Sequence, residues 1–187
     1  MASQKLYEPA PRFQQASSSV EGRVYVWGGR TLEFESKSED GRIKLARRIE
    51  QFDPYLENWS QLNTGGTPHP GLADAACTSF EDHLYMYGGF TSKGREGALS
   101  CLNVKTLTWS LLCSAETADG PMRKYGCGIV HFNNGKLAVI GGYGYPTEPG
   151  SFIRNYLMGE DGAMSFMSLT SVKVVIVKSI ECAHIDV

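Results

Sequence analysis

The chain has 187 residues, of which 42% are hydrophobic and 20% charged, a balance typical of a soluble globular domain. Its 18 basic and 20 acidic side chains give a net charge of −2, which provides no general positive field for nucleic acid or an anionic membrane. The start, MASQKLYEPAP, lacks the apolar core of a secretion signal, and the apolar run Val174–Val177 is far shorter than the ~20 residues of a membrane helix. We therefore expect a cytoplasmic protein, with the nucleus as an alternative, and neither a nucleic-acid nor a membrane partner.

Three segments of the chain superpose without a gap and end in a Gly-Gly pair: SSSVEGRVYVWGG, CTSFEDHLYMYGG and VHFNNGKLAVIGG. In each, a short strand leads to a polar turn, and four apolar residues then run into the glycines. Asn134-Gly135 in the third segment is the strongest short signal for a hairpin, because both central positions of the favoured turn need a positive φ. The segments predict three hairpins.

The second arm of each hairpin is apolar at every position, which predicts a strand buried on both faces. Small sheets stacked on one another satisfy this requirement. The paired glycines then allow the backbone to turn where no side chain fits, near a central axis. These structural glycines are Gly28, Gly29, Gly88, Gly89, Gly141 and Gly142.

A second repeated element follows the first two hairpins, in IEQFDPYLENWSQL and LSCLNVKTLTWSLL. Asp53 and Asn103 each stand six residues before a tryptophan, Trp59 and Trp109. An Asp or Asn side chain can close a turn, after which the tryptophan lies on an outer strand and packs between sheets. Hairpin, glycine pair, turn and tryptophan together predict a four-stranded blade, with Trp27, Trp59 and Trp109 in the core.

The spacing of these elements divides the chain into a repeat region over 1–160, with blades at about 9–64, 65–115 and 116–160, and a divergent tail over 161–187. The tail either completes blade three, for instance as an outer hairpin, or is unrelated to the repeats. The first blade carries a charged insertion at 31–48, expected to be a loop or one short helix. Its basic residues either form a solvated face or contact an acidic partner. They are Arg42, Lys44, Arg47 and Arg48.

Paired glycines after an apolar strand, followed by Asp or Asn and a Trp six residues on, resemble the kelch repeat, over about residues 9–145. The resemblance implies a propeller of the kind that binds other proteins and has five to seven blades. The expected fold is therefore all-β, a partial, open kelch β-propeller with two complete four-stranded blades plus an incomplete third. The segments PMRKYGCG and GGYGYPTEP are further similar to kelch receptors of cullin ubiquitin ligases that capture the C-terminus of a target. By that resemblance, Lys124 is available to a carboxylate and Tyr143 to a hydrogen bond.

Propellers usually bind with loops gathered at one mouth of the central channel, next to the glycine pairs. The candidate binding residues there are Arg12, Arg30, Arg123, Lys124, Tyr143 and Tyr145. For Arg12 and Arg123 the alternative is a structural role, hydrogen bonding to blade carbonyls. Tyr143 and Tyr145 could present two flat rings to a ligand, with a packed turn as the alternative.

Catalytic motifs are absent from the sequence: the four histidines have no HExxH-like spacing, and neither GxSxG nor GxxxxGK[ST] occurs. The five cysteines are odd in number, scattered and without a CxxC, so we expect reduced thiols, no metal site and no cofactor. The favoured function is a non-enzymatic module that binds a protein or peptide, as an adaptor or a substrate-recognition component of the ubiquitin-ligase type. One alternative is a truncated or alternatively ended propeller fragment with little independent function, whose uncovered blade faces favour self-association. Another is a kelch-type copper oxidase, whose Tyr-Cys radical site and histidine ligands the sequence does not mark.

Overall fold

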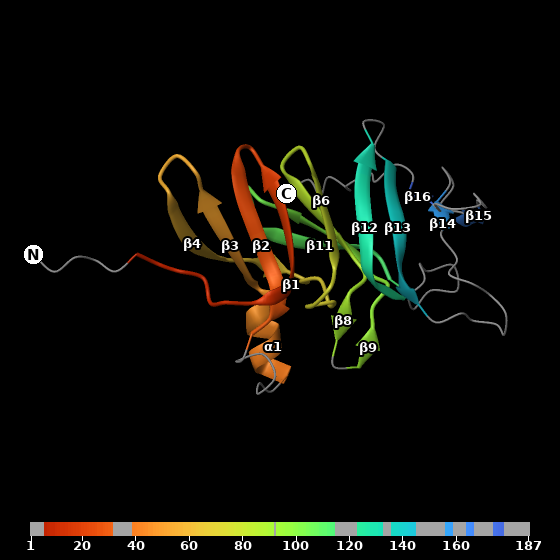
Figure 1. Cartoon of the computed structure of the whole chain (residues 1–187), viewed down its shortest axis with the longest axis horizontal. Coiled ribbons are helices and arrows are strands. Elements are labelled where there is room, and N and C mark those ends of the chain that lie inside the picture. The colour runs from red at the N-terminus through yellow and green to blue at the C-terminus, as the bar shows by residue number, and fades with distance from the viewer. Residues whose placement is uncertain are drawn as a thin grey trace, which may run out of the picture.

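The computed structural model describes residues 6–31, 39–91, 93–114, 123–132, 136–144, 156–158, 164–166 and 174–177. Three antiparallel sheets follow one another along the chain, and each is one blade (Figure 1). The predicted all-β fold, an open propeller with two four-stranded blades and an incomplete third, is confirmed. Among the described residues no helix is long and apolar enough to cross a membrane.

Blade 1 is a four-stranded sheet whose strands pair in chain order. Its strands are β1 (Phe13–Val20), β2 (Arg23–Arg30), β3 (Arg48–Asp53) and β4 (Asn58–Asn63). The β1–β2 turn places Glu21 and Gly22 at φ of 49° and 75°. The Asp53 carboxylate accepts hydrogen bonds from the backbone N–H groups of Tyr55 and Leu56, as the turn chemistry predicts. The described part of the charged insertion is one short helix, α1 (Glu39–Ala46), held by a 2.8 Å hydrogen bond from Trp27 Nε1 to the Ala46 carbonyl.

Blade 2 repeats this arrangement and adds a short fifth strand outside the tryptophan strand. Its strands are β6 (Ala76–Phe80), β7 (His83–Tyr87), β10 (Leu99–Asn103) and β11 (Thr108–Cys113), with β5 (Gly65–Gly66) parallel to β11. Asn103 closes the β10–β11 turn as Asp53 does in blade 1. Between β7 and β10, the hairpin of β8 (Phe90–Thr91) and β9 (Gly94–Arg95) projects from the same edge as α1 (Figure 1).

Blade 3 consists of three strands among the described residues: β12 (Lys124–Phe132), β13 (Lys136–Gly144) and β16 (Val174–Val177). The valine-rich segment of the tail pairs antiparallel with β13, with Leu137 opposite Val177. This segment is the third strand of the sheet that contains β12 and β13. Two further short strands, β14 (Tyr156–Met158) and β15 (Met164–Phe166), form a separate sheet, and β14 contacts β16.

Two apolar cores hold the blades together, and β7 contributes to both. Leu84 and Met86 enter the core between blades 1 and 2, whereas Tyr85 and Tyr87 enter the core between blades 2 and 3. Burial on both faces explains why the four residues Leu84–Tyr87 are all apolar, as predicted. Trp109 lies in the first of these cores, 2% exposed.

Trp59 is the blade 1 counterpart of Trp109 but is only half-buried. Trp109 points from blade 2 toward blade 1 and packs against Trp27, with ring centroids 5.5 Å apart. Trp59 packs against Phe52 with the rings tilted and their centroids 5.1 Å apart, on the face of blade 1 that no described blade covers. The tryptophan of this motif is buried by the preceding blade. Trp109 has such a blade among the described residues and Trp59 has none, which explains why the two differ in burial.

The glycine pairs build the junctions between blades. A Cβ on Gly28 would collide with the carbonyl of Leu72, and one on Gly88 would collide with the carbonyl of Lys124, both in the next blade. The following N–H groups donate to these carbonyls, from Gly29 to Leu72 at 2.6 Å and from Gly89 to Lys124 at 2.7 Å. Glycine is therefore required at the first position both by its positive φ and by the approach of the next backbone.

Candidate binding site

We define the mouth edge as the edge of the blades where the first strand of each blade begins and its second strand ends. Each blade places one residue at an equivalent position of this edge. These residues, two positions after the first glycine of the pair, are Arg30, Phe90 and Tyr143. They lie opposite Phe13, Ala73 and Tyr125 in the hairpins. The segments inserted between the second and third strands of blades 1 and 2, α1 and the β8–β9 hairpin, project from this edge too (Figure 1).

Side chains at the mouth edge form a continuous row of rings and guanidinium groups. The guanidinium of Arg30 lies 5.7 Å from the centre of the Phe90 ring, and Phe90 meets Tyr125 edge-on at 5.6 Å. Tyr125 stacks on Tyr143 at 5.8 Å, and the Arg95 guanidinium lies 5.4 Å from the Tyr125 ring centre. We call these five residues the mouth row. It joins all three blades and combines flat apolar area with positive charge.

Tyr143 and Arg123 are the exposed candidate residues of this region, and Arg30 is partly buried. The Tyr143 side chain is 66% exposed at the end of the mouth row. The Nε of Arg30 is buried and has no hydrogen-bond partner among the described residues. Arg123 is exposed beside the row and donates a long hydrogen bond, 3.4 Å, to the carbonyl of Arg95.

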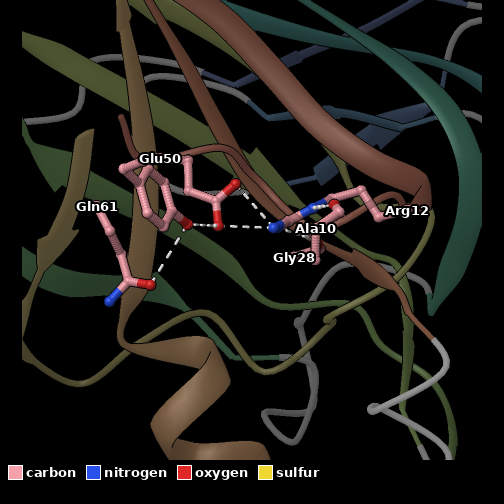
Figure 2. Close-up of polar contacts among 6 residues, drawn as sticks. Ala10, Arg12, Gly28, Glu50 and Gln61 are labelled. Carbon is pink, nitrogen blue, oxygen red and sulfur yellow. Dashed lines mark hydrogen bonds and ion pairs between the residues drawn. The ribbon is translucent and has the colours of Figure 1, made fainter. Parts of the chain in front are cut away.

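Arg12 and Lys124, two other predicted binding residues, lie inside their blades. Arg12 donates from Nη1 to the Gly28 carbonyl at 3.1 Å and from Nη2 to both carboxylate oxygens of Glu50, at 2.6 and 2.7 Å (Figure 2). Lys124 is 1% exposed, and its Nζ donates to the Gly141 carbonyl at 3.2 Å. Each cation thus binds the carbonyl of the first glycine in its own blade, which is the structural alternative for Arg12.

Blade 2 has Leu72 at the position of Arg12, and a histidine supplies the missing contact. His69 is fully buried, with Nε2 2.8 Å from the Gly88 carbonyl and Nδ1 3.0 Å from the Ser100 hydroxyl. Burial lowers the pKa of His69 to about 4, because desolvation disfavours the imidazolium, although the bond to Gly88 acts in the opposite direction. His69 is therefore neutral near pH 7.

A polar network lies beside Arg12, on the face of blade 1 that no described blade covers. The Tyr7 hydroxyl donates to Glu50 at 2.8 Å and lies 3.4 Å from the Gln61 side-chain oxygen (Figure 2). Burial, together with the hydrogen bond to Glu50, raises the pKa of Tyr7 to about 12. These residues line a cavity of about 240 Å³ together with Arg48 of β3.

The basic residues of the insertion gather around a second cavity, of about 550 Å³, between α1 and β4. Lys44, Arg47 and Arg48 line it, while the side chain of Arg42 lies outside the described part of the chain. The described ranges contain no group of three or more His, Cys, Asp or Glu side chains that could hold a metal ion. Four cysteines lie in these ranges as free thiols, and burial raises the pKa of Cys77 to about 12.

The structure thus brings Arg30, Arg123 and Tyr143 to one edge of the molecule and places Arg12 and Lys124 within the blades. Tyr145 lies outside the described residues. Sequence reasoning missed Phe90, Tyr125 and Arg95. The repeat alignment carries a signal for Phe90, which occupies the same position as Arg30 and Tyr143, whereas no repeated spacing marks Arg95.

Antiparallel sheets stacked through two apolar cores, with a glycine pair at each junction, define an open β-propeller. Residues 2–154 match the family model described as the KLHDC2/KLHL20/DRC7 Kelch-repeats domain, and the chain belongs to the kelch-repeat family. The predicted family resemblance is confirmed.

Several curated proteins are similar to the chain. Kelch domain-containing protein 2 of Homo sapiens is 26% identical over 151 residues, which cover 78% of this chain and 36% of that protein. It is the relative that the segments PMRKYGCG and GGYGYPTEP resemble. Kelch repeat and BTB domain-containing protein 12 of Danio rerio is 26% identical over 151 residues, 72% of this chain and 22% of that protein. Kelch-like ECH-associated protein 1A of Danio rerio is 32% identical over 98 residues, which cover 50% of this chain and 15% of that protein. The chain spans about a third of the length of the first of these relatives.

Proposed function

We propose that the chain is a protein-binding kelch module that recognises a carboxylate-bearing peptide segment at the mouth row. The observation that supports this function is the row itself, in which guanidinium groups and aromatic rings from three blades meet at one edge. Binding sites of this kind combine flat apolar area with a few polar groups that fix orientation.

The chemistry of the row favours an acidic ligand. Beside the row, the exposed guanidinium of Arg123 can donate charge-assisted hydrogen bonds to a carboxylate, each of which contributes about 1.5–3 kcal/mol. The exposed ring of Tyr143 can cover an apolar neighbour of that carboxylate, since a tyrosine loses little conformational entropy on binding. Arg12 and Lys124 then shape the mouth edge through the glycine carbonyls and do not contact the ligand.

More specifically, the protein-binding function that we propose is substrate recognition within a larger adaptor of the ubiquitin-ligase type. The likeness to Kelch domain-containing protein 2 and to a protein that also carries a BTB domain supports this role. In that role the carboxylate belongs to the C-terminus of the target, and an aspartate or glutamate side chain is the other source of the same chemistry.

A display library of random peptides with free C-termini, selected on the purified chain, tests the proposal. We expect enrichment of acidic peptides, with affinities measured by fluorescence anisotropy that fall for Tyr143→Ala and Arg123→Ala. The matched control is Tyr55→Ala, because Tyr55 is 89% exposed in the β3–β4 turn, away from the mouth edge. A chain that selects no peptide, or binds the selected peptides equally well after both mouth substitutions, would refute the site.

Amidation of the selected peptides identifies the source of the carboxylate. If the C-terminal carboxylate is bound, we expect the amidated peptide to lose about 1.5–3 kcal/mol of affinity, roughly 10- to 150-fold. A peptide that binds equally well after amidation but not after substitution of its acidic side chains would exclude C-terminal capture while retaining the mouth row as the site.

A further inference from the structure

The cavity between α1 and β4 gathers positive charge in a chain whose net charge is −2. Its volume is about 550 Å³, and its charged lining residues, Lys44, Arg47 and Arg48, are all basic and all exposed. No ion pair between described residues involves any of these three cations. The remaining lining residues are one apolar and three uncharged polar ones, Leu45, Gln61, Asn63 and Thr64. Among the described residues, the positive charge of the cavity is therefore not neutralised.

Backbone hydrogen bonds fix the position of Arg47 between α1 and the end of β4. The Arg47 carbonyl accepts from the N–H and from the hydroxyl of Thr64, at 2.8 and 2.9 Å. Thr64 is buried, and its hydroxyl also accepts from Trp109 Nε1 at 2.9 Å. Arg48 follows as the first residue of β3 and pairs with Asn63. Two of the three cations thus stand on rigid backbone, which favours a defined binding geometry.

The C-terminal end of α1 faces the same cavity, and helix carbonyls at such an end carry partial negative charge that opposes an anion. In α1, however, these carbonyls are occupied by donors. The Ala46 carbonyl accepts from Trp27 Nε1 at 2.8 Å, and the Ile43 carbonyl accepts from the Arg47 N–H at 3.1 Å. Lys44, in the last turn, and Arg47 add full positive charges at this end. The net field there favours an anion.

The cavity lies at the mouth edge, because β2 ends, β3 begins and β4 ends on that side of blade 1. Blade 2 shows that this end of an outer strand stays accessible when a neighbouring blade packs on the sheet. Leu111 occupies the position of Gln61, two residues after the tryptophan, and it is 48% exposed although Trp109 is buried against blade 1. A blade packed on the outer face of blade 1 would therefore leave this end of β4 open.

The number of cations matches a phosphate monoester better than a carboxylate. A phosphate monoester carries about −1.5 to −2 charges near pH 7 and offers three acceptor oxygens, whereas a carboxylate carries one charge and two oxygens. Each arginine presents a fork of donors that fits two phosphate oxygens, and a lysine adds a compact charge. Clusters of this kind are a recurring means of recognising phosphorylated segments of proteins.

We propose that the α1–β4 cavity binds the phosphate group of a phosphorylated serine or threonine in a protein partner. Arg47 and Arg48 donate to the phosphate oxygens, and Lys44 balances the remaining charge. That the phosphate belongs to a protein rests on the proposed function, because the cavity opens at the same edge as the mouth row. The anion site itself depends only on the residues that line the cavity.

Fluorescence anisotropy on the full chain tests the inference with two labelled pools of random peptides, one with phosphoserine and one with serine at the central position. Both pools have amidated C-termini and contain no acidic residues, so a carboxylate at the mouth row cannot contribute. We expect the phosphoserine pool to bind at least about tenfold more tightly, the gain from one or more charge-assisted hydrogen bonds. Equal affinities of the two pools would overturn the inference and leave the proposed carboxylate site unaffected.

Substitutions then locate the phosphate. Arg47→Gln and Arg48→Gln should each weaken binding of the phosphoserine pool about tenfold, while urea unfolding stays as in the unsubstituted chain because both side chains are exposed. The matched control is Lys105→Gln, which removes a cation that is 58% exposed in the β10–β11 turn, at the opposite edge. An equal loss in Lys105→Gln would show non-specific attraction, and a loss in Arg123→Gln but not in Arg47→Gln would place the phosphate at the mouth row. Either result would contradict the cavity site.

Inorganic phosphate distinguishes the two sources of the same group. If the ligand is a protein segment, inorganic phosphate should displace the phosphoserine pool only at concentrations at least about tenfold above the dissociation constant of the pool, because the free ion lacks the flanking peptide contacts. Displacement at or below that dissociation constant would assign the cavity to a free phosphate ion and overturn the protein partner.

Discussion

Replacement of Arg12 by methionine should strongly destabilise the chain, because it leaves a buried carboxylate without its cation. Arg12 is 16% exposed and binds both oxygens of Glu50, whose side chain is 6% exposed. Methionine retains most of the aliphatic packing but provides no donor. Tyr7 would remain as the described hydrogen-bond donor to Glu50.

The size of this effect follows from the geometry. Removal of one partner from a buried ion pair costs about 3–5 kcal/mol, and the residual exposure of Arg12 places the expected loss near the lower end, about 3 kcal/mol. The double variant Arg12→Met/Glu50→Leu should recover part of that loss, since the orphaned charge is removed as well.

Urea unfolding followed by tryptophan fluorescence, at one fixed protein concentration, measures both effects. The reasoning fails if Arg12→Met costs less than about 1 kcal/mol, the range of an exposed ion pair. It also fails if the losses of unfolding free energy measured for Arg12→Met and for Glu50→Leu alone simply add in the double variant, because the two partners would then not be coupled.

Three further predictions concern the blade interfaces. Trp109→Ala should lower the free energy of unfolding by about 4 kcal/mol and Trp59→Ala by about half as much, because only Trp109 is enclosed between two blades. The same urea unfolding measures both values, and equal losses would contradict this assignment. Gly88→Ala should lower the melting temperature far more than Gly94→Ala, since only Gly88 faces the backbone of the next blade. Because the pKa of His69 falls from 6.5 unfolded to about 4 folded, the unfolded state binds more protons between these values. Stability should therefore fall as the pH drops from about 6.5 to about 4, by about 3 kcal/mol from this group, and His69→Gln should flatten that dependence.

Local chemistry made most of the fold predictable. The glycine pairs, the Asp53 and Asn103 turns and the apolar second strands each depend on a few neighbouring residues, and all three appear where the repeat placed them. The pairing of β16 with β13 could not be predicted, because Val174–Val177 matches no repeat and its partner lies more than 30 residues away.

The site was less predictable than the fold because its residues meet only through stacking of the blades. Arg12 and Arg123 both precede a first strand, yet one is bound within its blade and the other is exposed. In blade 2, His69 contacts the carbonyl of the first glycine, as Arg12 and Lys124 do in their blades, but from a different sequence position, which no spacing rule indicates. The edge-on contact of Phe90 with Tyr125 joins blades 2 and 3 and requires the tertiary structure.

Hydrogen–deuterium exchange with a bound, display-selected acidic peptide tests the proposed function most directly. If the mouth row binds the peptide, protection should concentrate at the ends of β2 and β13, in the β8–β9 hairpin and at the start of β12. Protection in the β3–β4 turn or on the outer faces of blades 1 and 3, with the mouth edge unchanged, would contradict the account.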